Sequence, residues 1–120
     1  CIRVPVLNGH TAAVFVNFAK SPTKEELLEK LENFKGLPQE LELPSAPKQF
    51  IRYLEEDNRP QVKLDVDYEN GMGISVGRIR EDSVYDWKFV GLSHNTVRGA
   101  AGGAVLCAET LTAKGFIQAK

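Results

Sequence analysis

The chain has 120 residues, of which 42% are hydrophobic and 26% are charged. This composition predicts one globular domain with a buried core rather than a disordered chain. The 15 basic and 16 acidic residues give a formal net charge of −1, which argues against nucleic acid or an anionic membrane as a partner. The two cysteines are too few for a disulfide scaffold and lack the spacing of a zinc site, so we expect a cytoplasmic protein without a metal.

The chain begins with two predicted strands. Residues 3–6 and 12–18 are rich in valine and phenylalanine, and Asn8-Gly9 between them is typical of a hairpin turn. The first of these strands is already under way at Cys1, with no methionine before it. We therefore interpret the chain as a piece of a longer protein.

A helix is predicted to follow, and its N-terminus has two possible caps. Ser21 could cap it with Pro22 in the first turn, or Thr23 and Glu26 could form a capping box. Gly36 is expected to end the helix. The apolar stripe of this helix, which predicts packing on a sheet, comprises Leu27, Leu28, Leu31 and Phe34.

The central part of the chain is predicted to contain a loop-like arm and three strands. Residues 37–60 are rich in proline and acidic side chains and lack periodicity, so we expect turns and extended segments there. Residues 62–68, 74–79 and 85–92 each have the pattern of a strand, and Asn70-Gly71 is a turn signal. Because these three segments follow one another closely, we expect them to pair antiparallel.

The last predicted element is a helix from residue 97 to residue 114, stopped by Gly115. Its first half is the glycine-rich segment 99–104, and each interior glycine costs about 1 kcal/mol relative to alanine. We therefore expect a neighbouring backbone or a ligand to approach this segment closely. Cys107 lies among small and apolar residues of the helix and is interpreted as a packed residue.

Three polar residues are candidates for chemistry, although each also has a structural interpretation. His10 follows a turn glycine and suits proton transfer, but the local sequence by itself favours a surface or capping histidine. Arg3 could bind a carboxylate at two points or form an internal salt bridge. His94, at a predicted helix start, is interpreted as a capping or exposed residue. No phosphate-binding loop is recognised, because the glycines at 71–73 lead into a strand.

Four motifs of the chain resemble aspartate-semialdehyde dehydrogenase of the archaeal and fungal type. They are CIRVPV with Gly9-His10 at residues 1–10, RPQ at 59–61, VGRIR at 76–80 and LSHNTVRGAAGG at 92–103. Because the motifs lie at both ends and in the middle, the resemblance covers the whole chain.

The resemblance implies an NADP-dependent phosphorylating dehydrogenase that interconverts aspartyl phosphate and aspartate semialdehyde, on the route to lysine, threonine and methionine. Residues 1–120 would be the later portion of its substrate-binding and dimerisation domain. The expected partners are the small-molecule substrate, phosphate and further copies of the chain in a homodimer or homotetramer. The nucleophilic cysteine and Gly-rich cofactor loop of the family would lie upstream, and a C-terminal helix at residues 95–115 would pack on the absent cofactor domain.

The resemblance also implies roles for three residues. Arg3 matches the arginine that binds the substrate carboxylate, His10 matches the acid/base histidine, and Asn95 matches a cofactor-binding position near the nicotinamide. In a tight hairpin, Arg3 would lie about 13 Å along the strand from Leu7, so Arg3 and His10 would share a face without being neighbours. We therefore expect a more open turn.

The fold that we expect is α/β or α+β, with a mixed, largely antiparallel sheet and helices on one face, resembling the C-terminal domain of glyceraldehyde-3-phosphate dehydrogenase. Two other functions stay open. Malonyl-CoA reductase shares these motifs and would use the same residues on a thioester, and a non-catalytic dimerisation module is the alternative from another class. We expect the chain alone to be inactive, and its open sheet face to mediate self-association.

Overall fold

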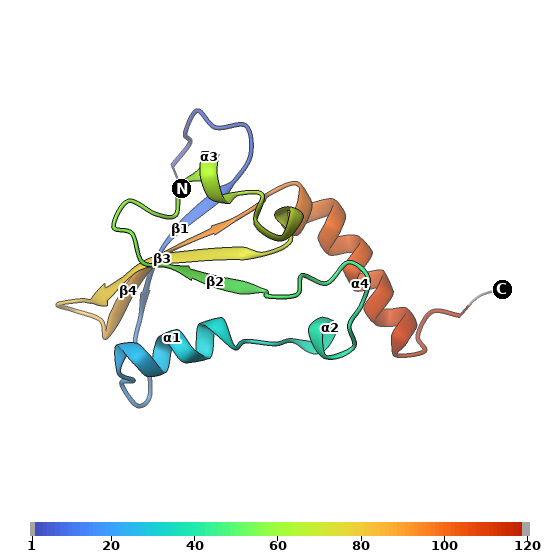
Figure 1. Cartoon of the computed structure of the whole chain (residues 1–120), viewed down its shortest axis with the longest axis horizontal. Helices are drawn as coiled ribbons and strands as arrows, with labels where there is room; N and C mark the ends of the chain where they lie inside the picture. Colours follow the sequence, from blue (N-terminus) through green and yellow to red (C-terminus); the bar gives the residue numbers. More distant parts are fainter. Residues whose placement is uncertain (1, 119–120) are drawn as a thin grey trace.

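A four-stranded mixed sheet is the centre of the structure, a computed structural model in which residues 2–118 are described (Figure 1). Its strands are β1 (His10–Val16), β2 (Ile51–Leu54), β3 (Ile74–Glu81) and β4 (Trp87–Ser93). Their spatial order is β1-β4-β3-β2, in which β2 runs parallel to β3 and the other two neighbouring pairs are antiparallel. The sheet is therefore mixed and largely antiparallel, as the sequence predicts.

Two longer helices and several short helical segments surround the sheet. They are α1 (Lys24–Glu32), α2 (Leu37–Glu40), α3 (Val62–Asp65), the 3₁₀ turn η1 (Tyr68–Gly71), the π-helical turn η2 (Val97–Ala101) and α4 (Gly102–Ala113). None of the described helices has the length and apolar character needed to cross a membrane.

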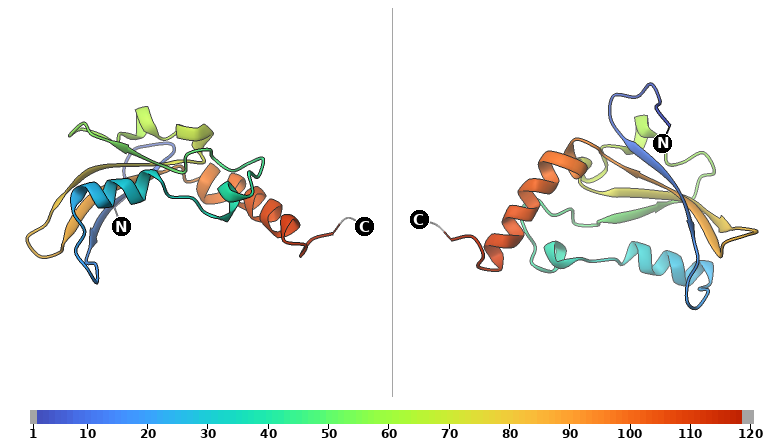
Figure 2. Two further views of the ribbon diagram at one scale, coloured as in Figure 1. Left: turned by 60° about the horizontal axis from the view of Figure 1, so that its bottom comes forward. Right: turned by 180° about the vertical axis from the view of Figure 1, so that it is seen from behind.

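One face of the sheet packs against α1 and forms the hydrophobic core. The fully buried members of this core are Leu27, Val76, Ile79 and Trp87. Figure 2 shows α1 on one side of the sheet and α3 on the other. The Trp87 indole N–H donates to the carbonyl oxygen of Pro22 at 3.1 Å, which ties β4 to the chain that leads into α1.

The helix α1 begins at the capping box and not at Ser21. The Thr23 hydroxyl accepts the backbone N–H of Glu26 at 3.2 Å, and the Glu26 carboxylate accepts the backbone N–H of Thr23 at 2.8 Å. An N-cap of this kind contributes about 1 kcal/mol to helix stability. Phe34 lies beyond the end of the helix, where its ring centroid is 5.7 Å from that of Phe50.

The hairpin predicted at Asn8-Gly9 does not form. Residues 2–9 are a loop, and β1 pairs instead with β4 over seven residue pairs. The loop leaves 88% of Ile2 and 98% of Leu7 exposed. Pairing with β4 is favoured because β4 offers a full ladder of backbone hydrogen bonds, whereas residues 3–6 contain Pro5, which has no N–H to donate.

Residues 62–68 form α3 and part of η1, so the strand predicted there is wrong. The alternation of apolar and charged residues suggests that the apolar ones face the core, but Leu64 is 58% exposed whereas Asp65 is only 2% exposed. Ion pairs with Arg52 and Arg59 compensate the charge of the buried Asp65, and these tertiary contacts decide the local conformation. Of the three predicted antiparallel strands, only β3 and β4 form.

The segment predicted as a loop-like arm contains the short strand β2. It pairs in parallel with β3 over four residues. All four residues of β2 are half-buried and show no alternation, so nothing in the local sequence marks a strand. The free edge of β3 imposes the extended conformation on this segment.

The C-terminal helix is confirmed and starts with the wider turn η2. A Cβ at Gly102 would lie 2.5 Å from the Sδ of Met72, and a Cβ at Gly103 would lie 2.5 Å from the carbonyl oxygen of Arg98, so the glycines admit the close approach of one side chain and one backbone oxygen. The helix ends before Gly115, which has a φ of +78°. Cys107 is exposed and not packed as predicted, because the buried residue of α4 is Leu106.

Candidate functional site

A hollow lies beside the first residues of β1 and is lined by residues of the N-terminal loop and of α3. Figure 1 shows this loop and α3 close to one another at the same end of the sheet. The lining of the hollow includes Arg3, Gly9, His10, Val62 and Asn95. The fold thus brings to one place the three residues that the sequence assigns to substrate, proton transfer and cofactor. The more open turn that we expected is present, because a loop and not a hairpin strand carries Arg3.

Pairing of β1 with β4 brings the first residues of the chain and residues 93–95 together at this hollow. His10 lies opposite Ser93 in the first register position of β1. Just beyond the strands, the Gly9 backbone N–H donates to Asn95 Oδ1 at 2.8 Å, although the two residues are 86 positions apart. Asn95 therefore ties the corner formed by Gly9 and His10 to the end of β4.

A second contact holds the same corner from the side of α3. Gly9 has a φ of +103°, a conformation that favours glycine. A Cβ on Gly9 would lie 3.0 Å from Cγ1 of Val62, so the valine packs directly against the glycine backbone. The Asn95 hydrogen bond and the Val62 contact together restrict where His10 can lie.

His94 orders the turn that carries Asn95. Its Nδ1 accepts the backbone N–H of Thr96 at 3.2 Å and that of Val97 at 3.1 Å. The side chain is only 5% exposed, so the capping role predicted for His94 is confirmed and the exposed alternative is wrong. Because Nδ1 accepts, the ring proton is on Nε2, which lies 3.8 Å from Oδ1 of Asp67.

The side chains of Arg3 and His10 are both exposed in this chain. Within residues 2–118, neither side chain makes a hydrogen bond or an ion pair. The internal salt bridge considered for Arg3 is therefore absent from the described residues. The guanidinium keeps its planar set of donors available for a carboxylate, and the imidazole keeps both nitrogens available for proton transfer.

The donor set at the hollow suits an organic ligand. Asn95 Oδ1 accepts the hydrogen bond from Gly9, so the two N–H donors on Nδ2 of the amide can bind an acceptor such as a carbonyl oxygen. In the part of the chain that the structure describes, no group of three or more histidine, cysteine, aspartate or glutamate side chains could hold a metal ion.

Sequence reasoning missed Val62 as a lining residue of the hollow. The apparent alternation over residues 62–68 assigned it to a sheet strand. Contact with Gly9 depends on the tertiary path of the segment and has no local signature.

Comparison with known proteins identifies the family. The family model described as semialdehyde dehydrogenase, dimerisation domain, matches residues 1–98. The chain belongs to this family. Aspartate-semialdehyde dehydrogenase of Schizosaccharomyces pombe is 50% identical to this semialdehyde dehydrogenase dimerisation domain over 120 residues, covering 98% of the chain and 34% of the relative. Malonyl CoA reductase (NADP) of Metallosphaera sedula is 44% identical over 117 residues, covering 96% of the chain and 33% of the relative.

The fold of this dimerisation domain agrees with that of a solved relative. The crystal structure of aspartate-semialdehyde dehydrogenase with NADP from Candida albicans superposes with a TM-score of 0.85 at 46% identity, covering 96% of this chain and 33% of that one. The chain thus spans about a third of the length of these relatives. The resemblance to aspartate-semialdehyde dehydrogenase and the mixed-sheet fold are both confirmed.

Proposed function

We propose that residues 1–120 are the substrate-binding and dimerisation part of an NADP-dependent phosphorylating dehydrogenase. The complete protein would interconvert aspartyl phosphate and aspartate semialdehyde in lysine, threonine and methionine biosynthesis. The observation that supports this most is the convergence of Arg3, His10 and Asn95 on one hollow, in a chain that is 50% identical to an aspartate-semialdehyde dehydrogenase.

Each of the three residues has a role that its chemistry suits. The Arg3 guanidinium binds the substrate carboxylate at two points and orients the aldehyde. His10 takes the proton from the thiol of the nucleophilic cysteine in the rest of the protein, gives it to the aldehyde oxygen as the hemithioacetal forms, and takes it back from that hydroxyl as the hydride leaves. NADP, when bound, accepts the hydride from the hemithioacetal carbon, and phosphate then releases the acyl group from the cysteine. Asn95 donates from Nδ2 to an acceptor oxygen of the cofactor.

Reduction of a malonyl thioester is the second candidate reaction, supported by the 44% identity to a malonyl CoA reductase. Arg3 and His10 would act on that substrate in the same way, because it also carries a carboxylate close to an acyl group. An assay of the full-length protein with each substrate separates the two. Turnover of aspartate semialdehyde with phosphate supports the first proposal. Turnover of malonyl-CoA without turnover of aspartate semialdehyde supports the second.

We predict that the isolated 120-residue chain is inactive. Cys107 is exposed on α4 and receives no hydrogen bond from another described residue, and Cys1 lies outside the described residues. The sequence also has no phosphate-binding loop for the cofactor. The purified chain should give no NADPH absorbance with aspartate semialdehyde, phosphate and NADP, while the full-length protein does. Turnover by the chain alone would show that it contains a nucleophile of its own.

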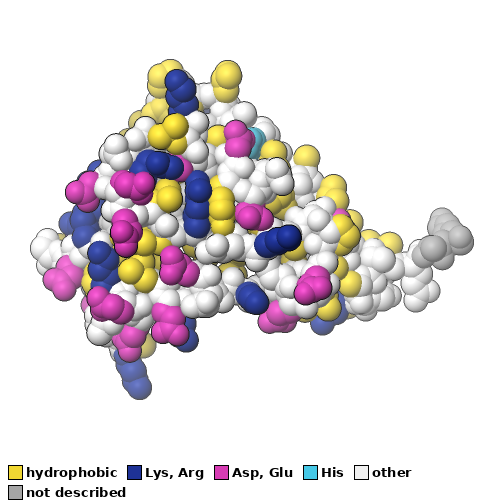
Figure 3. Space-filling view, viewed as in Figure 1, with side chains coloured by type: hydrophobic (Ala, Val, Ile, Leu, Met, Phe, Trp, Pro, Cys, Tyr) yellow, Lys and Arg dark blue, Asp and Glu magenta, His cyan; other side chains and the backbone are white. Residues whose placement is uncertain are grey.

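The C-terminal helix region, residues 95–115, is proposed to pack on the cofactor domain of the full-length protein. Among the described residues of α4, only Leu106 is buried, whereas Val105 is 51% and Leu111 39% exposed. Figure 3 shows hydrophobic side chains along the outer edge of α4. Exposed apolar side chains on a helix are typical of a surface that contacts a further part of a protein, which supports contact with the two thirds of the relatives that this chain does not span.

We propose that a second copy of the chain covers the part of the sheet face opposite α1 that α3 and the segment before it leave open, around Phe15 and Tyr85. Phe15 is 52% exposed and Tyr85 44% exposed, and their ring centroids are 5.8 Å apart. Because Val16 packs on the core side, its neighbour Phe15 lies on the opposite face. An exposed aromatic pair beside an edge strand is typical of an interface, which agrees with the dimerisation domain of the matching family.

Phe15→Asp is therefore expected to shift the full-length protein toward the monomer in sedimentation equilibrium. The buried charge would have no partner in a face-to-face contact. Leu41→Asp is the matched control, since Leu41 is 43% exposed but lies after α2, away from this face. If both variants remain as associated as the unchanged protein, the interface lies elsewhere.

Substitution of Asn95 separates its two contacts. Asn95→Asp keeps an acceptor oxygen for the Gly9 N–H but removes the donor, so kcat should stay within about threefold while KM for NADP rises. Asn95→Ala removes both, and kcat should fall by about tenfold or more because His10 loses its support. Steady-state kinetics of the full-length variants decide this. Equal kcat losses in the two variants would show that the Gly9 hydrogen bond does not matter.

A further inference from the structure

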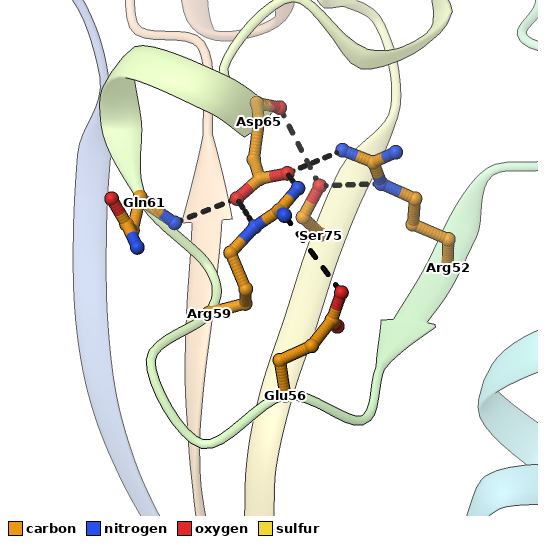
Figure 4. Close-up of polar contacts among 6 residues, drawn as sticks. All are labelled: Arg52, Glu56, Arg59, Gln61, Asp65 and Ser75. Atoms are coloured by element: carbon orange, nitrogen blue, oxygen red, sulfur yellow. Dashed lines mark hydrogen bonds and ion pairs between the residues drawn. The ribbon is translucent and has the colours of Figure 1, made fainter.

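The most heavily hydrogen-bonded side chain among the described residues is the carboxylate of Asp65, at the end of α3 (Figure 4). It is only 2% exposed. It accepts Arg52 Nη2 at 2.8 Å, Arg59 Nε at 2.8 Å, Arg59 Nη2 and the Gln61 backbone N–H at 2.7 Å. Both of its oxygens therefore receive charge-assisted hydrogen bonds, which are the stronger kind.

The arginines of this cluster are themselves fixed. Arg52 Nε donates to the Ser75 hydroxyl at 3.0 Å, and the Arg52 guanidinium lies 4.1 Å from the ring centroid of Tyr68. The hydrogen bond from Arg59 is the main cause that holds the pKa of Asp65 below its usual value, against the opposing effect of burial. The carboxylate is therefore ionised at neutral pH. Its cluster connects three parts of the chain, namely β2, β3 and the segment that precedes α3.

The cluster presses the segment from Arg59 to Asp65 onto the sheet. A Cβ at Gly77 would lie 2.4 Å from the carbonyl oxygen of Arg59 and 3.0 Å from Cδ of Pro60. The backbone of the segment thus touches β3 directly at a position where only glycine leaves room. We call residues 59–65 the strap.

The strap passes beside the candidate site. Val62, in its middle, packs against Gly9, and its Cγ1 would lie 3.0 Å from a Cβ there. The Cδ1 atom of Leu92, in β4, would lie 3.4 Å from the same Cβ on Gly9. Val62 also lines the hollow together with His10. A continuous path of contacts therefore leads from the buried Asp65 to the residue before His10.

We propose that Asp65 is a positioning residue for the reaction and not only a stabilising one: by locking the strap, it holds Val62 against Gly9 and so sets the place of His10. This inference rests on the proposed acid/base role of His10. Val62 transmits the effect because a side chain packed on a glycine backbone leaves that backbone little freedom to move.

The test compares three variants of the full-length protein. Asp65→Asn weakens the cluster, and Val62→Ala leaves the cluster intact but removes the contact with Gly9. Asp82→Asn is the control, because Asp82 also receives a strong ion pair, from Lys88 Nζ at 2.7 Å. Asp82 comes directly after β3, whose last residue pairs with Trp87, and Trp87 in turn pairs with Val16 at the end of β1. His10, at the other end of β1, is about 20 Å from this end of the sheet.

The proposal expects Asp65→Asn and Val62→Ala to lower kcat by about tenfold each, with KM for the aldehyde changed less than about threefold. In both variants the limb of the kcat pH profile that disappears in His10→Asn should move. Asp82→Asn should leave kcat and that limb unchanged, even where it lowers the melting temperature. The double variant of Asp65 and Val62 should lose no more than the more severe single variant, since both act through one contact.

Unchanged kcat and an unmoved limb in Val62→Ala would overturn the proposal, whatever Asp65→Asn does. Should Asp65→Asn fail to fold, Val62→Ala decides alone, with Arg59→Lys as the milder change to the cluster. His10→Asn separates this inference from the proposed function. If it retains kcat, the function itself is wrong, whereas a large loss in His10→Asn together with normal Asp65 and Val62 variants refutes the inference only.

Discussion

His10→Asn in the full-length protein is expected to lower kcat by roughly 10²–10⁴, the usual contribution of a general acid/base group. Asparagine keeps much of the size and one hydrogen bond of the imidazole but cannot accept and release the proton. His10 is exposed in the hollow and makes no hydrogen bond with another described side chain, so its loss removes no internal support. KM for the aldehyde should change little, because the histidine acts on the reacting atoms rather than on the carboxylate.

The measurement is steady-state kinetics across pH, with thermal unfolding as the check on folding. The limb of the kcat profile that belongs to the imidazole should disappear in the variant, while the melting temperature stays within a few degrees. A variant with near-normal kcat would mean that His10 is a surface residue at the start of β1. The role carried over from the family at this position would then be wrong.

Arg3→Lys is expected to raise KM for the substrate severely, by about 10²-fold, with a smaller fall in kcat. The lysine ammonium keeps the charge but cannot make the planar two-point contact with a carboxylate. The lost contact costs on the order of 2–3 kcal/mol, the range of charge-assisted hydrogen bonds. Because Arg3 has no ion pair within the described residues, this loss falls on the ligand and not on the fold.

The control for this prediction is Arg78→Lys. Arg78 is exposed on β3 and does not line the hollow, so KM should stay as in the unchanged protein. A ligand without the carboxylate offers a second comparison: the simple aldehyde should bind equally poorly to the Arg3 variant and to the unchanged protein. An Arg3→Lys enzyme with unaltered KM would show that another group, outside this chain, holds the carboxylate.

The sequence by itself determined the elements whose signals are local. Thr23 and Glu26 mark the start of α1, because a capping box needs only four consecutive residues. The apolar segments of β3 and β4, and the small-residue run that ends at Gly115, likewise carry their conformation in short-range pattern and turn chemistry. The family motifs named Arg3, His10 and Asn95, although no local rule explains their roles.

Tertiary structure decided the elements whose partners are distant in sequence. Residues 2–9 are a loop because β1 pairs with β4, and β2 is a strand because the edge of β3 is free for it. The segment 62–68 is helical because Asp65 is drawn in by Arg52 and Arg59, which no period of two or of 3.6 residues can reveal.

The same division holds at the candidate site. Motifs could name its three polar residues, but the bond from Gly9 to Asn95 joins positions 86 apart, and Val62 reaches Gly9 only along the path of the strap. Such contacts have no sequence period, since they depend on which strands pair and on which buried charge must find partners. The sequence therefore determined which groups are present at the site, and the folded chain decided how firmly each is held.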